Sequence, residues 1–121
     1  MLEVVLSTSA DQDFAEIVLW SEDHFGPRPS LRYQSLILAA FADLAADPDR
    51  LGSIDRSKIM PGCRTYHLIH SRRRIPLPRV ENPRYFVVFR VQGRRLEVGR
   101  LLHDNMNVDE KIATEGFGSF D

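Results

Sequence analysis

The chain has 121 residues, with 43% hydrophobic and 27% charged side chains and a net charge of −1, which is typical of one globular domain and argues against disorder. It contains no apolar run of the roughly 18 residues that a membrane-spanning helix needs, and its first residues lack the basic start of a secretory signal. The single cysteine, Cys63, excludes an internal disulfide and a CxxC zinc or redox motif, so we expect a cytoplasmic protein without a cofactor.

The first half of the chain predicts one strand followed by two helices. Residues 2–7 form a short apolar run that is typical of a strand. Residues 9–12 have the S-x-x-Q form of a capping box, and apolar side chains then recur at helical spacing until Gly26 and the proline after it end the helix. Ser30 is the predicted cap of a second helix, which ends at Asp47 and the proline behind it. Two amphipathic helices joined by so few residues form a helical hairpin.

The second half predicts a sheet. A connector rich in Asp, Ser, Pro and Gly occupies residues 48–62, and strand patterns follow at 63–71, 84–91 and 95–103, the last two joined by a tight turn at 92–94. The run 84–91 is apolar on both faces, which is typical of a central strand. The order β-α-α-β-β-β predicts an α+β fold in which the helical hairpin packs on one face of a small, mainly antiparallel sheet.

The charges are strongly segregated along the chain. Residues 1–55 carry three arginines against ten acids, a net charge of −7, and residues 56–100 carry twelve Lys and Arg against two acids, a net charge of +10. Residues 101–121 have a net charge of −4. A basic middle between acidic ends predicts a face for an anionic partner, either nucleic acid or an acidic protein segment. The alternative is that the oppositely charged parts pair with one another across the fold.

The most basic stretch is YHLIHSRRR at residues 66–74, with two histidines and three consecutive arginines. Side chains alternate between the two faces of a strand, so His67 and His70 are expected to point in opposite directions and cannot form an HxxH metal pair. We therefore predict no metal site. One of the two histidines is expected to be a structural residue that is hydrogen-bonded near the core.

Arginines from several predicted strands are the candidate binding groups. Arg72 is expected nearer the sheet than the two arginines after it, for which a solvated rim and a binding role are equal alternatives. Arg84, Arg90 and Arg100 belong to the neighbouring strands. Guanidinium groups that converge from several strands form forks suited to phosphate or carboxylate.

Three longer segments carry a resemblance to a known family. RTYHLIHSR at 64–72, NPRYFVVFRV at 82–91 and RLLHDNM at 100–106 resemble the ParE branch of the RelE/ParE toxin superfamily. The likeness extends to the initial strand, to the AFADLA run of the second predicted helix and to PGCR at 61–64. YHLxHSR followed by a PRYF-like strand and an LHDxM end is a specific combination.

The resemblance implies the toxin of a type II toxin–antitoxin pair. ParE-type toxins act as protein inhibitors that poison DNA gyrase, and a cognate antitoxin binds them tightly and neutralises them. We accordingly expect a cognate antitoxin and DNA gyrase as partners, with no membrane attachment and no sequence-specific DNA binding by the toxin alone. The residues predicted to bind partners are Arg64, Tyr66, His70, Arg72, Arg84, Arg90, Arg100 and His103.

RelE-type relatives instead cut mRNA on the ribosome, and this endonuclease activity is the alternative function. Cleaving RNA needs groups that take and give a proton and cations that stabilise the phosphorane. RelE-type members supply them with lysine, arginine and a terminal tyrosine, whereas here His103 lies near the terminal position, Asp104 follows it and no tyrosine occurs after Tyr85. The charge of Asp104 beside a phosphate disfavours an RNase. A relative that only binds an antitoxin is a third alternative.

The likeness to the family stops before the C-terminus. Residues 1–106 are predicted to form the ParE-like toxin domain, and residues 107–121 a C-terminal extension. Within this extension, one helical turn is predicted after Asn107, followed by a loose, glycine-rich end.

Overall fold

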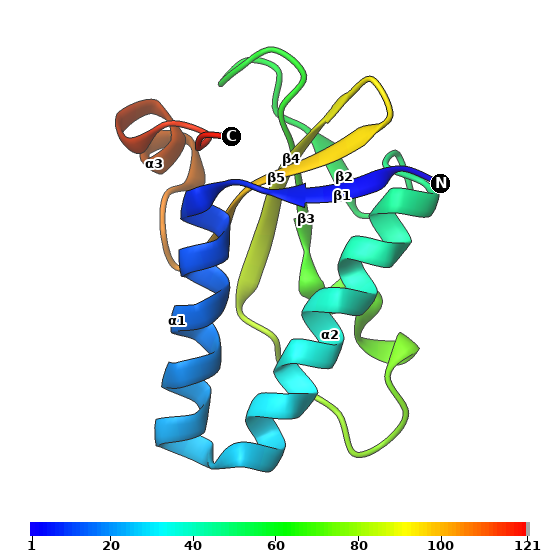
Figure 1. Cartoon of the computed structure of the whole chain (residues 1–121), viewed down its shortest axis with the longest axis vertical. Helices are drawn as coiled ribbons and strands as arrows, with labels where there is room; N and C mark the ends of the chain where they lie inside the picture. The colour runs from blue at the N-terminus through cyan, green and yellow to red at the C-terminus, as the bar shows by residue number, and fades with distance from the viewer. Residues whose placement is uncertain (121) are drawn as a thin grey trace.

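A mixed five-stranded sheet carries a long helical hairpin on one face in the computed structural model, which describes residues 1–120 (Figure 1). The strands run in the order β1-β5-β4-β3-β2, with β1 parallel to β5 and the other neighbours antiparallel. This arrangement confirms the predicted α+β fold and the central place of the strand that is apolar on both faces. The elements are β1 (Glu3–Leu6), α1 (Thr8–Phe25), α2 (Pro27–Ala46), β2 (Ser53–Asp55), β3 (Arg64–His67), the 3-10 helix η1 (Leu68–Arg74), β4 (Tyr85–Gln92), β5 (Arg95–His103) and α3 (Val108–Glu115).

The two helices of the hairpin begin earlier than predicted. Ser7, not Ser9, caps α1, and its Oγ accepts a hydrogen bond from the backbone N–H three residues on at 2.9 Å. Gly26, with a φ of 89°, ends α1 as predicted, and α2 begins directly at Pro27 because proline suits the first turn of a helix. The Ser30 hydroxyl therefore does not cap α2. It donates to a backbone carbonyl of α1 at 3.0 Å and joins the two helices near their turn.

The main hydrophobic core fills the space between the helical hairpin and the sheet. Partly buried Phe14 of α1 packs on buried Phe41 of α2 with the ring centroids 6.4 Å apart. A fully buried side chain of this size stabilises a fold by roughly 1.5–3 kcal/mol. The hairpin is thereby fixed over β3, β4 and β5. The buried members of this core are Ala10, Ile17, Leu36, Ile37, Ala40, Phe41, Leu44, Tyr66, Leu68, Val87, Phe89, Leu96, Val98 and Leu101.

A second, smaller core lies on the opposite face of the sheet, which the prediction left without a helix. Helix α3 and the segment behind it bring Ile112 and Phe117 against Val88 and Leu102. Phe117 belongs to the glycine-rich end that was predicted to be loose, yet it is only 5% exposed. Gly99 allows this close approach, because a Cβ there would lie 2.2 Å from the carbonyl oxygen of Phe117. The division of the chain at residue 107 stays a prediction.

The predicted strand at 63–71 is wrong beyond His67, where the chain turns into the 3-10 helix η1. The reason is a buried carboxylate on α2. Asp43 accepts hydrogen bonds from Ser71 Oγ at 2.6 Å and from Arg74, and it forms an ion pair with Arg50 at 2.7 Å. The Ser71 hydroxyl accepts in turn from the Tyr66 hydroxyl at 2.7 Å. These bonds hold η1 against α2, so the chain after His67 leaves the sheet.

We expect Asp43→Asn to lower the free energy of unfolding by about 2–3 kcal/mol, because the change removes the charge from a buried site that binds two guanidinium groups. Asp49→Asn is the matched control: its carboxylate is 77% exposed and lies 3.6 Å from Arg64, so the loss should be below about 1 kcal/mol. Urea denaturation of the two variants measures both values. Equal losses would contradict the role given to Asp43.

Candidate functional site

Four of the residues predicted to bind partners lie in β3 and η1 and are largely engaged within the protein. Arg64 Nε donates to Ser53 Oγ at 2.8 Å. Tyr66 is fully buried, so its side chain is part of the core and offers no surface. His70 is exposed as a whole residue, but its ring lies over Gly52. The partial burial of the ring lowers the pKa of the imidazole. Arg72 Nη1 donates to the backbone carbonyl of residue 81 at 2.8 Å.

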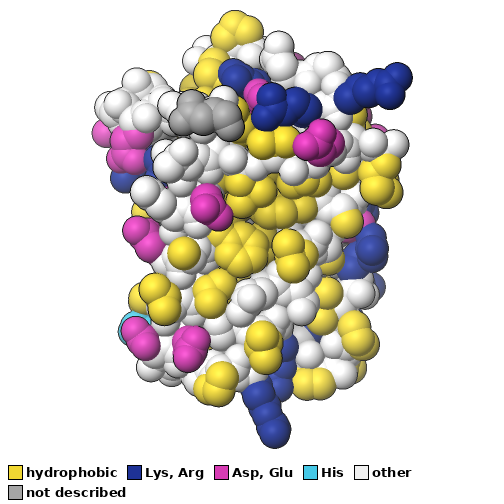
Figure 2. Space-filling view, viewed as in Figure 1, with side chains coloured by type: hydrophobic (Ala, Val, Ile, Leu, Met, Phe, Trp, Pro, Cys, Tyr) yellow, Lys and Arg dark blue, Asp and Glu magenta, His cyan; other side chains and the backbone are white. Residues whose placement is uncertain are grey.

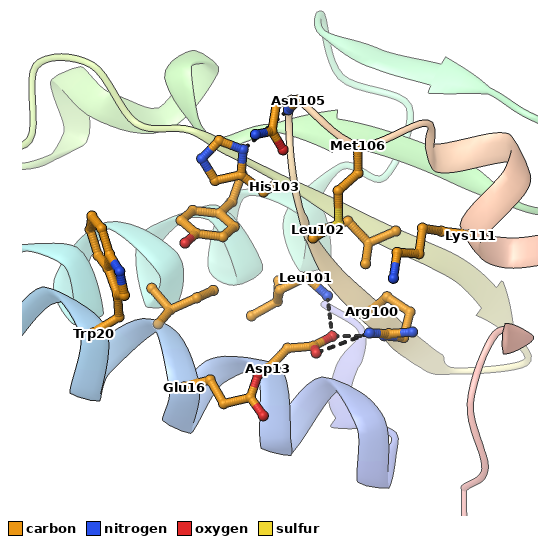
Figure 3. Close-up of a pocket in the computed structure, with 12 residues that line it drawn as sticks. Asp13, Glu16, Trp20, Arg100, Leu101, Leu102, His103, Asn105, Met106 and Lys111 are labelled. Carbon is orange, nitrogen blue, oxygen red and sulfur yellow. Dashed lines mark hydrogen bonds and ion pairs between the residues drawn. The ribbon is translucent and has the colours of Figure 1, made fainter.

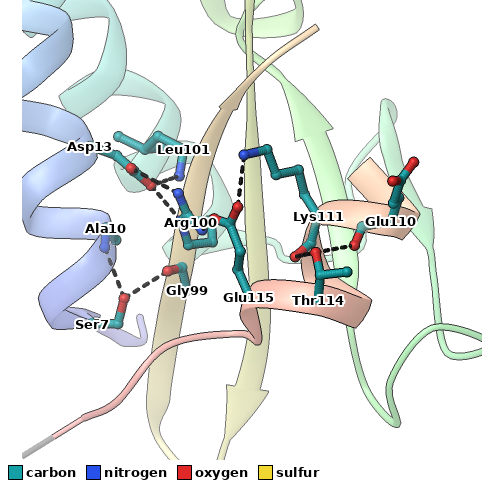
Figure 4. A network of polar contacts seen from close by, with 10 residues as sticks. All are labelled: Ser7, Ala10, Asp13, Gly99, Arg100, Leu101, Glu110, Lys111, Thr114 and Glu115. Atoms are coloured by element: carbon teal, nitrogen blue, oxygen red, sulfur yellow. Dashed lines mark hydrogen bonds and ion pairs between the residues drawn. The ribbon is translucent and has the colours of Figure 1, made fainter. Parts of the chain in front are cut away.

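The arginines of β4 and β5 do not converge, because each binds a different carboxylate. Arg90 donates to Glu97 at 2.8 Å, with its guanidinium 4.6 Å from the centre of the Phe117 ring on the α3 side. Arg100 reaches α1 and α3 at once: it donates to Asp13 at 2.8 Å and to Glu115 at 2.8 Å (Figure 4). These two carboxylates raise the pKa of Arg100 above its usual value, whereas Arg100 and Lys111 lower the pKa of Glu115 to about 2. The predicted fork of three strand arginines is therefore not formed.

A polar cluster that the sequence did not predict lies where β3, β4 and β5 meet, with Asp104 at its centre. Arg84 donates to both oxygens of Asp104, from Nε at 2.9 and 3.1 Å, and His67 Nε2 lies 3.0 Å from Asp104 Oδ2. His67 Nδ1 accepts from the Ile69 backbone N–H at 3.1 Å, so both ring nitrogens are used. The hydrogen bond from Arg84, followed by that from His67, lowers the pKa of Asp104 below its usual value. Through Asp104, the cluster connects the end of β3, the start of β4 and the end of β5.

His103 differs from His67 because only one of its ring nitrogens has a partner in the part of the chain that the structure describes. Nδ1 accepts from the Asn105 backbone N–H at 3.1 Å, and the ring lies edge to face on Tyr85 with the centroids 5.1 Å apart. Its side chain is 28% exposed. Nε2 is therefore left for solvent or a ligand.

Two adjoining recesses lie between α1 and the end of the sheet, and His103 lines both. The first, of about 510 Å³, runs along β5 between Asp13 and Met106 (Figure 3). The second, of about 420 Å³, continues toward the turn of the hairpin and is mostly apolar. Both recesses are lined by Ile17, Trp20, Tyr85 and His103, so together they form one continuous groove.

A separate apolar groove of about 480 Å³ lies between α1, α2 and the outer edge of β1. Figure 2 shows hydrophobic side chains gathered on this face, between the two helices and β1. An exposed apolar patch of this kind is typical of a protein-binding surface. We call it the apolar groove, and its lining includes Val4, Leu6, Phe14, Leu38 and Phe41.

The comparison with protein families agrees with the fold and with the resemblance seen in the sequence. Residues 4–108 match the family described as ParE toxin of type II toxin-antitoxin system, parDE. The chain belongs to the ParE toxin family. A solved structure titled "Chromosomal ParDE TA system from P. aeruginosa" has the same fold, with a TM-score of 0.63 and 18% identity over 85% of this chain and 96% of that one. No curated protein matches the sequence.

Within this ParE family member, residues 1–120 contain no helix that is long and apolar enough to cross a membrane. In the same residues, no three His, Cys, Asp or Glu side chains come together as a metal site requires. Sequence reasoning missed Trp20, whose side chain is 49% exposed at the centre of the groove. The signal was available, because Trp20, His24 and Phe25 place three rings on one turn at the end of a helix.

We expect Arg84→Gln to raise the pKa of Asp104 toward its usual value of 3.8, because Arg84 contributes the largest favourable interaction with the ionised carboxylate. Because the pKa of Asp104 is lower in the folded state than in the unfolded state, this carboxyl adds to the free energy of unfolding at pH values above its unfolded pKa. The contribution disappears as the pH falls through the folded pKa. Carboxyl ¹³C NMR titration measures the shift. Arg79→Gln, which removes an exposed ion pair elsewhere, should leave the Asp104 titration unchanged.

Proposed function

We propose that this protein is a toxin that inhibits DNA gyrase by binding it in the cytoplasm, and that a cognate antitoxin neutralises it. Membership of the ParE toxin family supports the toxin assignment. The observation that favours inhibition by binding over RNA cleavage is the pairing of the strand arginines with carboxylates. Arg84 binds Asp104, Arg90 binds Glu97, and Arg100 binds two acids.

RNA cleavage through the 2′-hydroxyl would need cations that are free to stabilise a phosphorane with additional negative charge. A scissile phosphate placed at the end of the sheet would have to compete with Asp104 for Arg84, and the carboxylate itself would repel it. His67 cannot take a proton there without giving up the hydrogen bond that its Nδ1 accepts. These contacts argue for a surface that binds a protein and does not transfer phosphoryl groups.

The mRNA endonuclease is the second candidate because of one observation: in the described residues the Nε2 of His103, beside the groove, has no hydrogen-bond partner. A single imidazole general base typically contributes about 10²–10⁴-fold to a rate. An endonuclease that depended on His103 would therefore lose nearly all of its activity when this side chain is replaced.

We expect His103→Gln to keep most of the toxicity, because one polar change at the edge of a protein interface often costs no more than about 1 kcal/mol. The purified toxin should slow supercoiling by gyrase and leave ribosome-bound mRNA uncut. Arg73→Gln is the control for changes in folding, because Arg73 is exposed and does not line the groove. Codon-specific cuts in mRNA that vanish in His103→Gln would reject gyrase inhibition and establish the endonuclease.

We propose that the antitoxin places an amphipathic segment in the apolar groove. The groove supplies a mostly apolar surface between two helices and a sheet edge, and an amphipathic helix lays its apolar face into a groove of this kind. Met1 and Leu2 also line a neighbouring recess that contains Arg94, so this basic residue lies within reach of an acidic segment. Charge complementarity of this kind raises the rate of association and fixes the direction of the segment.

We expect Leu38→Glu to weaken antitoxin binding by about tenfold or more, because it places a charge in the apolar groove where desolvation is required. Leu38 is 57% exposed, so the change should have little effect on folding. Leu31→Glu is the matched control, since Leu31 is on the same helix, 59% exposed and outside the groove lining. Isothermal titration of antitoxin into each variant measures the difference, and equal affinities would reject the groove as the antitoxin site.

A further inference from the structure

The recess nearest the hairpin turn has walls made mainly of aromatic rings. Tyr33 and Tyr85 meet edge to face with their centroids 5.9 Å apart, and Tyr85 meets His103 in the same way at 5.1 Å. Trp20 and Phe25 form the opposite wall, also edge to face, at 5.6 Å. We call this recess the aromatic pocket, and its defining residues are Trp20, Ser21, Phe25, Tyr33, Tyr85 and His103.

The outer wall of the aromatic pocket is held in place although it is exposed. Trp20 and Phe25 are 49% and 62% exposed, which is unusual for two large apolar rings in contact. The Trp20 ring is stacked on His24 at 4.1 Å, and His24 Nδ1 is 2.8 Å from the Trp20 carbonyl oxygen. A tryptophan that is fixed in this way before binding loses little entropy when a partner covers it.

Ser21 gives an independent indication that the aromatic pocket binds a ligand. Its residue is 1% exposed and lines the pocket, yet Oγ has no hydrogen-bond partner among residues 1–120, and no other buried side-chain polar atom there lacks one. A buried hydroxyl without a partner is destabilising. Because Oγ itself is buried, a ligand hydrogen-bonds to it once the Ser21 side chain rotates toward the pocket, and that bond removes the penalty. Tyr33 adds a second hydroxyl, which accepts from the Arg84 backbone N–H at 2.9 Å and keeps its own hydrogen free to donate.

The charges around the pocket favour a protein segment with a basic residue. The adjoining recess shares Trp20, Tyr85 and His103 with the pocket. Its two cations, Arg100 and Lys111, are already paired with carboxylates. Its other acid, Glu16, is an exposed carboxylate with no ion pair in the described part of the chain. The only charged residue lining the pocket itself is Arg84, and Asp104 already neutralises it. A nucleotide would bring its phosphate toward these carboxylates without a free cation to bind it.

We propose that the aromatic pocket receives a tyrosine or tryptophan side chain from a partner protein, with a neighbouring lysine or arginine of that protein paired to Glu16. The ring lies between Trp20 and Tyr85, and its hydroxyl or indole N–H donates to Ser21 Oγ. The partner is the toxin's target and not its antitoxin, because the proposed antitoxin segment occupies the separate apolar groove, whose neighbouring recess contains Arg94. Only this choice of partner rests on the proposed function.

The first test uses Trp20, the single tryptophan of the chain, as a fluorescent reporter of binding. The probe is the peptide acetyl-Lys-Tyr-Lys-amide, titrated into the purified full chain. We expect acetyl-Lys-Tyr-Lys-amide to bind saturably, with a Kd in the millimolar range or tighter. Relative to this peptide, acetyl-Lys-Leu-Lys-amide should bind about tenfold more weakly and acetyl-Glu-Tyr-Glu-amide at least about fivefold more weakly. Equal binding of the three peptides, no saturable change, or tighter binding of adenosine monophosphate would overturn the proposal.

The second test uses Ser21→Ala in the same titration. The variant should bind acetyl-Lys-Tyr-Lys-amide about fivefold more weakly while its melting temperature is unchanged or higher, because it removes a hydroxyl that has no partner in the free protein. A serine with a merely structural role would give the opposite pattern, a lower melting temperature with unchanged peptide binding. That result would overturn the proposal.

The third test separates the pocket from the proposed function. Trp20→Ala should weaken inhibition of gyrase supercoiling by about tenfold or more and change antitoxin affinity by no more than about twofold. Leu19→Ala is the matched control, because Leu19 is 60% exposed and does not line the pocket. Peptide binding without any inhibition of gyrase by the unmodified toxin would reject gyrase as the target and leave the pocket intact. Loss of antitoxin affinity in Trp20→Ala would overturn the assignment of the pocket to the target.

Discussion

The arrangement of the molecule depends most on the ion pair between Arg100 of β5 and Asp13 of α1. The guanidinium donates from Nε at 2.8 Å and from Nη2 at 3.1 Å, and the same carboxylate accepts the Leu101 backbone N–H at 3.0 Å. Three convergent bonds fix the rotation of α1 as well as its position. Because Trp20 lies roughly two helical turns further along α1, it faces the end of β5, where His103 lies. The hydrophobic core holds the hairpin over the sheet, and this pair sets how α1 faces the groove.

The segregation of charge along the sequence is largely used inside the fold. Basic residues of the middle segment bind acids of the first and last segments: Arg74 binds Asp43, Arg64 lies near Asp49, and Arg84 binds Asp104. These pairs connect elements that are distant in the chain, which explains why a total charge near zero accompanies strong local excesses. The alternative in which oppositely charged parts pair across the fold therefore accounts for much of the basic middle, and a binding role for that middle is limited to its unpaired members.

Local sequence signals predicted the elements, whereas contacts between distant residues decided where several of them end. Gly26 ended α1 as predicted because a positive φ suits glycine, and β4 was recognised as central because both of its faces are apolar. The strand at 63–71 was predicted too long because Ser71 bonds to Asp43, a contact that no period-two pattern reveals. The aromatic pocket was missed for the same reason, since Trp20 and Tyr85 are far apart in the sequence.

Helix α1 supplies a wall to both the apolar groove and the aromatic pocket, through Phe14 on one side and Trp20 on the other. An occupant that reshaped one recess by moving α1 would first have to separate Asp13 from Arg100, a pair whose side chains are only 12% and 14% exposed, and this separation is energetically costly. The two recesses are therefore energetically close to independent. A partner in the apolar groove can exclude a partner from the aromatic pocket only through the bulk that it extends beyond the groove, and not by deforming α1.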